Sequence, residues 1–185
     1  MAGANLTVTP LKKGLVKLTR GGVARIVDLS KNISGCILVN DGAGKKFDSS
    51  FFVGVDSVIK NGKTYLVLLA QAGASCNVMG YAGADIDLTL IWLKLSGRLQ
   101  VEDKKAVVVE SRAYQEVGLT LPETFQDRKG NRRPFRLIRG KLLVKFETNR
   151  YLTDEPYSLS TLRYARNQPE KGLVVKTVKR ERPAN

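Results

Sequence analysis

The chain has 185 residues, of which 43% are hydrophobic and 26% are charged, a balance that excludes wholesale disorder. Its length predicts a single domain over residues 1–185. The formal net charge of +14 favours a polyanionic partner, nucleic acid before acidic membranes or acidic proteins, over a charge that serves solubility alone.

The N-terminal half of the chain consists of short β-type runs separated by turns. Runs at residues 6–9, 15–19, 23–28 and 36–40 are alternating or rich in β-branched side chains. Runs at 51–60 and 64–70 flank Asn61-Gly62. This dipeptide predicts a β-hairpin, because both central residues of a type I′ turn need a positive φ. Another short run follows at residues 75–81.

Residues 86–101 contain the longest apolar run. Ile86, Leu88, Leu90 and Trp92 alternate onto one face, and Ile91, Leu93 and Leu95 occupy the other. A strand that is apolar on both faces is typical of the centre of a sheet or sandwich. Gly97 predicts a bulge or bend, and residues 102–104 predict a turn into a further strand at 105–112.

The C-terminal third is predicted to contain a basic hairpin, one helix and a last strand. The hairpin joins residues 135–138 to 141–147 through Arg139-Gly140, with Leu142, Val144 and Phe146 on its apolar face. The helix is predicted over 154–166 from capping residues, Pro156 in the first turn and an apolar stripe. A strand at 173–178 ends the fold. Turn signals at intervals of roughly 8–12 residues then predict a mainly β fold, an antiparallel β-sandwich or barrel-like domain with one short C-terminal helix.

The chain contains no histidine. This excludes Ser-His-Asp and Cys-His catalytic arrangements and most zinc sites, so we expect no enzyme, no cofactor and no metal. Cys36 and Cys76 lie beside apolar residues and are predicted to be buried free thiols rather than a disulfide. Asp85 and Asp87 are two residues apart, which is a weak signal for a divalent ion; we favour a solvated end of the long strand instead.

The basic segment, residues 126–151, contains the excess charge of the C-terminal half. From residue 128 to residue 150 it has nine cations and a net charge of +8: Arg128, Lys129, Arg132, Arg133, Arg136, Arg139, Lys141, Lys145 and Arg150, against Glu147. Arginine predominates, and its planar guanidinium grips phosphate with two hydrogen bonds and stacks on bases. Phe135 and Tyr151 are candidates for stacking on a base, whereas alternation assigns Phe146 to the core.

Two further groups of cations are candidates for secondary contacts. Lys45 and Lys46 follow a glycine-containing loop that lacks the GxxxxGK[ST] spacing of a nucleotide-binding loop. Lys179, Arg180 and Arg182 belong to a basic tail, residues 179–185, that we expect to be flexible.

The sequence therefore predicts a non-catalytic subunit of a nucleoprotein complex that binds RNA or single-stranded DNA rather than duplex, together with other protein subunits. The first alternative is a structural coat protein with a basic, genome-facing surface, and the second is a histidine-free nuclease. An acidic protein partner also remains open for the basic segment. No signal peptide or membrane span is visible, so we expect a cytoplasmic location, or a virion under the coat-protein alternative.

Overall fold

The computed structural model describes residues 5–40, 45–74, 76, 86–111, 118–119, 135–148 and 157–180. In this part of the chain the regular elements are strands and two short 3₁₀ turns, η1 (Ser30–Asn32) and η4 (Pro169–Lys171). The prediction of a mainly β, antiparallel fold is confirmed. Among these residues, no helix is long and apolar enough to cross a membrane.

The strands form four antiparallel sheets. The central sheet has the order β6-β7-β8-β9, formed by Phe51–Lys60, Lys63–Gly73, Ile86–Leu95 and Val101–Glu110. The C-terminal sheet has the order β10-β11-β12-β13, formed by Gly118–Leu119, Lys141–Thr148, Tyr157–Ala165 and Val174–Arg180. The N-terminal sheet has the order β1-β2-β3, formed by Thr7–Pro10, Leu15–Arg20 and Val23–Asp28. The fourth sheet is the hairpin of β4 (Leu38–Asn40) and β5 (Lys46–Asp48).

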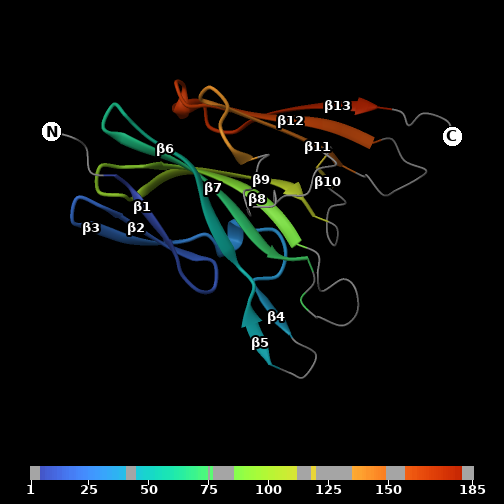
Figure 1. The fold of residues 1–185 in the computed structure, drawn as a ribbon, viewed down its shortest axis with the longest axis horizontal. Helices are drawn as coiled ribbons and strands as arrows, with labels where there is room; N and C mark the ends of the chain where they lie inside the picture. The colour runs from blue at the N-terminus through green and yellow to red at the C-terminus, as the bar shows by residue number, and fades with distance from the viewer. Residues whose placement is uncertain are drawn as a thin grey trace.

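Three of these sheets lie in layers, with the central sheet between the N-terminal and C-terminal sheets (Figure 1). Tyr65, Val67, Leu90 and Trp92 on one face of the central sheet pack with Leu142, Val144, Phe146, Leu162 and Tyr164 of the C-terminal sheet. Leu66, Leu68, Ile91 and Leu93 on its other face pack with Val16, Leu18 and Leu29 of the N-terminal layer. The prediction of a central strand with two apolar faces is confirmed for Ile86–Leu95, because β8 contributes to both cores; the strand ends at Leu95, and Val101 begins β9.

Two predicted hairpins have the expected turn geometry. Asn61 and Gly62 connect β6 to β7 with φ values of 50° and 71°, as a type I′ turn requires. Arg139 and Gly140 have φ values of 50° and 72° and precede β11. Only a single bridge, between Ile138 and Lys141, closes this second turn, and Phe135 lies in the core, so no strand forms over 135–138.

The predicted C-terminal helix is wrong. Residues 157–165 of that segment form strand β12, which pairs with β11 on one side and β13 on the other; residues 154–156 lie outside the described part. Ser160, Leu162 and Tyr164 alternate as buried positions along it. Pairing on both sides and the burial of this alternating face outweigh the local helix signals, since helix propensity is only a weak prior.

The predicted turn at residues 102–104 is also wrong, because Val101–Glu110 is one continuous strand. The chain turns earlier, between β8 and β9, where the amide of Leu99 donates to the carbonyl of Ser96. Gly97 lies in this turn and not in a bulge within a strand. Charged residues are compatible with β9 because it is an edge strand whose first half is exposed.

The two cysteines form a disulfide, so the prediction of buried free thiols is wrong. The Cα atoms of Cys36 and Cys76 lie 5.1 Å apart although 40 residues separate them in sequence. Cys36 is brought to this place by an isolated bridge to Gly73 at the end of β7. This long-range contact leaves no local pattern in the sequence.

Candidate nucleic-acid interface

The C-terminal sheet presents one face to the core and one face to solvent. On β11 the side chains of Leu142, Val144 and Phe146 are buried, as predicted, and those of Lys141, Leu143 and Lys145 are exposed. The register of β12 and β13 extends this alternation over three strands. We call the solvent-facing side of β11–β13 the outer face; it contains Lys141, Leu143, Lys145, Glu147, Tyr157, Leu159, Thr161, Arg163, Ala165, Val174, Lys176, Val178 and Arg180.

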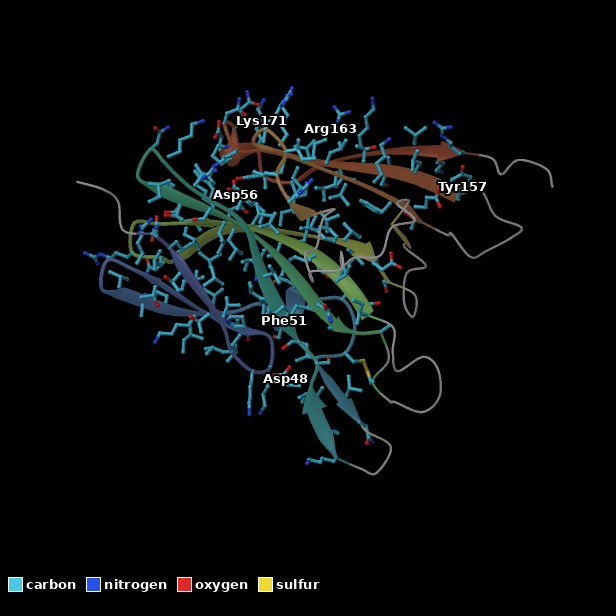
Figure 2. All side chains as sticks on the ribbon, viewed as in Figure 1. Asp48, Phe51, Asp56, Tyr157, Arg163 and Lys171 are labelled. Carbon is cyan, nitrogen blue, oxygen red and sulfur yellow. A yellow bond between two sulfur atoms is a disulfide. The ribbon has the colours of Figure 1, made fainter. Side chains whose placement is uncertain are left out.

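The outer face contains five cations and one carboxylate. The cations are Lys141, Lys145, Arg163, Lys176 and Arg180, all exposed, and the carboxylate is Glu147. Figure 2 shows Arg163 on this layer and nitrogen-tipped side chains along its solvent edge. Such an arrangement creates a positive potential over one side of the molecule.

Some cations elsewhere in the described residues have carboxylate partners. Lys60 Nζ lies 2.9 Å from Glu170 Oε2, and its hydrogen bond holds the pKa of that carboxyl below its usual range. Lys63 and Lys94 pair with Glu102. Within the described residues, no ion pair involves Lys141, Arg163 or Lys176. These three exposed side chains therefore have no carboxylate partner in the described part of the chain.

The solvent-facing side of the N-terminal sheet differs in charge. Its strands present Lys17 and Asp28 together with threonines and the exposed side chain of Ile26, according to their register. At these outward positions one cation is opposed by one carboxylate, whereas the corresponding positions of β11–β13 have five cations and one carboxylate.

The structure brings only part of the predicted site together. Lys141 and Lys145 lie on the outer face, Arg139 lies in the turn that precedes β11, and Arg136 is exposed shortly before that turn. Five of the nine predicted cations lie outside the described residues: Arg128, Lys129, Arg132, Arg133 and Arg150. The same holds for Tyr151 and Arg182.

The two predicted secondary groups separate. Lys46 belongs to β5 and Lys45 precedes it, and this hairpin projects at the opposite end of the molecule from β11–β13 (Figure 1). Arg180 belongs to the outer face. Its neighbour Lys179 alternates to the other side of β13 and pairs with Ser158. The predicted stacking role of Phe135 is wrong, since that ring is 4% exposed and packs in the core.

Sequence reasoning missed Arg163 and Lys176 as members of the interface. Arg163 lies within the predicted helix 154–166, whereas strand pairing puts it between Leu143 and Val174. Lys176 lies in the predicted last strand and faces Thr161. The signal that could have found them is the period of two in Tyr157–Ala165, where Ser160, Leu162 and Tyr164 face inward and Thr161 and Arg163 outward.

A buried polar cluster attaches the outer layer to the central sheet. The hydroxyl of Tyr164 on β12 donates to Asp56 Oδ2 at 2.9 Å, and Arg166 Nε lies 3.5 Å from Asp56 Oδ1. Asp56 belongs to β6, next to a register shift in its pairing with β7. Burial first, and then the hydrogen bond and charge of Asp56, raise the pKa of Tyr164 above its usual range. This Asp56 cluster holds Tyr164 in its neutral, donating form.

We expect Tyr164→Phe to lower the free energy of unfolding by about 1.5–3 kcal/mol, because a hydrogen bond to a buried carboxylate is lost. The folded protein retains the Tyr164 proton above pH ~10, where the unfolded chain releases it. The contribution of this hydroxyl is therefore complete below that pH and declines as the pH rises further. Urea titrations of wild type and Tyr164→Phe at neutral and alkaline pH measure both effects. Tyr65→Phe is the control, and an equal loss in the two variants would contradict a specific role of the Asp56 hydrogen bond.

Asp87, one of the two predicted aspartates, does not lie at a solvated strand end. Asp87 is completely buried, and its Oδ2 accepts hydrogen bonds from the hydroxyls of Ser34 at 2.8 Å and Ser111 at 2.9 Å. Asp85 lies outside the described residues. Among the residues described, no group of three or more His, Cys, Asp or Glu side chains could hold a metal ion. The geometry of Asp87 is that of a buried carboxylate with hydroxyl partners.

Comparison with known proteins identifies no relative: no family model, no curated protein and no solved structure matches this chain. The interface is therefore interpreted from its own geometry and charge.

Proposed function

We propose that this protein is a non-catalytic, nucleic-acid-binding subunit of a nucleoprotein complex and that its outer face contacts the phosphates of RNA or single-stranded DNA. The observation that supports this most is the concentration of cations on one solvent-facing sheet surface, where Lys141, Arg163 and Lys176 have no ion pair within the described residues. Mutual repulsion among these cations is relieved when a polyanion binds.

A single strand suits this surface better than a duplex. Aliphatic side chains lie among the cations, with Leu143 53%, Val174 48% and Val178 47% exposed. Unpaired bases offer apolar faces to such side chains, whereas a duplex presents mainly phosphates and grooves. The described residues also contain no α-helix to enter a major groove. Contacts of this kind give binding that depends strongly on salt and weakly on sequence.

The second candidate function is a coat or shell protein whose basic face contacts a packaged genome. The disulfide between Cys36 and Cys76 favours this alternative, because disulfides persist in oxidising compartments and on virions and are rare in the cytosol. The first proposal implies other protein subunits and a cytoplasmic location, and the second implies self-assembly and a virion. Light scattering of the purified protein with and without RNA discriminates them, since only a shell protein forms particles of defined large size.

The experiment that tests the proposed function is binding of the wild-type protein to labelled single-stranded RNA, single-stranded DNA, duplex DNA and poly-glutamate over a salt series. We expect the logarithm of the affinity for the single strands to fall linearly with the logarithm of the salt concentration, with a slope of about −0.7 for each phosphate contacted. Both single strands are expected to bind more tightly than the duplex.

Two outcomes would contradict this function. The first is a dissociation constant in the non-specific range, about 10⁻⁴–10⁻⁶ M at physiological salt, for every nucleic acid. Such weak binding would argue against a dedicated nucleic-acid surface. Poly-glutamate binding as tightly as RNA would indicate an acidic protein partner instead.

A further inference from the structure

The register of the outer face arranges its side chains in diagonal rows. Lys141 on β11, Arg163 on β12 and Lys176 on β13 are each one strand and two residues from the next, since Arg163 is paired with Leu143 and Lys176 with Thr161. We call these three residues the cationic stripe. Diagonal neighbours of this kind lie about 7–8 Å apart, so the stripe extends over roughly 15 Å.

A neutral row runs beside the cationic stripe. Leu143 on β11, Thr161 on β12 and Val178 on β13 are related by the same diagonal step. We call them the neutral stripe. Its two aliphatic side chains are exposed, Leu143 to 53% and Val178 to 47%. Leu143 pairs with Arg163, Thr161 pairs with Lys176, and Val178 follows Lys176 by two residues on β13, so the two rows run side by side.

We propose that a single-stranded nucleic acid lies diagonally across β11–β13, with its phosphates over the cationic stripe and its bases over the neutral stripe. This inference rests on the proposed function and adds to it the orientation of the bound strand and the part of the nucleotide that each row contacts. A nucleotide has a charged phosphate on one side and a base with an apolar flat face on the other, and the paired stripes reproduce that division side by side.

The arrangement selects single strands by a mechanism that charge alone does not provide. A cation attracts the phosphates of duplex and single strand alike, whereas Leu143 and Val178 gain contact only from bases that are unstacked and exposed. Arg163 lies at the centre, because Lys141, Lys145 and Lys176 are all its diagonal neighbours on the two adjoining strands. A phosphate bound at Arg163 is therefore within the field of four cations.

The test replaces the aliphatic side chains without altering charge. In the variant Leu143→Ser, Val178→Ser we expect affinity for single-stranded RNA to fall about 5- to 10-fold, from the apolar area that the two side chains would bury, while the salt slope stays unchanged. Affinity for duplex RNA is expected to stay at the wild-type value. The matched control is Ile26→Ser, Ile59→Ser, which removes two aliphatic side chains that are 64% and 54% exposed on other strands.

The outcomes separate this inference from the proposed function. The diagonal arrangement is overturned if the Leu143→Ser, Val178→Ser variant binds single strands as tightly as the wild type. The proposed function stays in place in that case, provided that the wild type binds single strands with a steep salt slope. Equal weakening for single-stranded and duplex RNA also overturns the diagonal arrangement, because a base contact cannot act on a duplex. Failure of the wild-type protein to bind any nucleic acid overturns both. Circular dichroism melts of each variant establish that it is folded.

Discussion

A variant with Lys141, Arg163 and Lys176 changed to alanine is expected to bind single-stranded RNA roughly 50-fold less tightly than the wild type at about 0.15 M salt. Each phosphate contact on a single strand contributes about 0.7 to the salt slope, so the loss of three contacts lowers the slope by about 2. All three side chains are exposed, and within the described residues none forms an ion pair whose loss would destabilise the fold.

The matched control for this variant is Lys12→Ala, Lys17→Ala, Arg25→Ala, which changes the net charge by the same amount on the N-terminal side of the molecule. These three side chains are exposed on or beside β2 and β3, which belong to the opposite outer layer. We expect the control to retain affinity within about 3-fold of the wild type, as a general effect of net charge is weaker than direct phosphate contact. Equal losses in the two variants would show that total charge, and not the outer face, determines binding.

The second large effect is expected for Trp92→Ala, which should lower the free energy of unfolding by about 3–5 kcal/mol. Trp92 is 4% exposed, stacks on Tyr65 with ring centroids 6.1 Å apart, and donates its indole N–H to the carbonyl of Pro169 at 3.0 Å. This hydrogen bond attaches η4, the turn that leads from β12 to β13, to the central sheet. In a chain of this size the melting temperature is expected to fall by roughly 6–20 °C.

Gly172 lies against the indole ring of Trp92. This glycine has φ = 62°, and a Cβ atom placed on it would lie 3.2 Å from the indole ring. The chain therefore passes directly over the face of Trp92 at the start of β13. We expect Trp92→Phe to be destabilised less than Trp92→Ala, because it keeps an aromatic surface and loses the hydrogen bond to Pro169. Thermal melts followed by circular dichroism measure both variants, and a melting temperature for Trp92→Ala within about 2 °C of wild type would contradict this account.

The part of the fold that follows from local patterns was predictable. Asn61-Gly62 specified its hairpin because only a few residues adopt positive φ at two successive positions. The alternation of Leu142, Val144 and Phe146 specified which side of β11 is buried. The double apolar face of β8 placed that strand at the centre of the molecule, since a strand can be covered on both sides only between two other layers.

The predictions that failed depend on partners distant in sequence. The segment 157–165 has acceptable signals for a helix, and it became a strand because β11 and β13 supply hydrogen bonds on both sides. The apolar neighbours of Cys36 and Cys76 predict buried thiols, but the two residues form a disulfide, because the fold brings their Cα atoms within 5.1 Å across 40 residues of sequence and no local feature indicates this.

For the candidate site, the sequence by itself determined that the protein is strongly basic and that Lys141 and Lys145 share the solvent-facing side of one strand, because charge and a period of two are local properties. Only the tertiary structure decided which other cations join them. Arg163 and Lys176 lie 22 and 35 residues after Lys141, and the pairing of three strands places them on one diagonal next to Leu143 and Val178. The physical reason is that strand register is set by burial of the opposite, apolar face against the central sheet, and the arrangement of the cations follows from that burial.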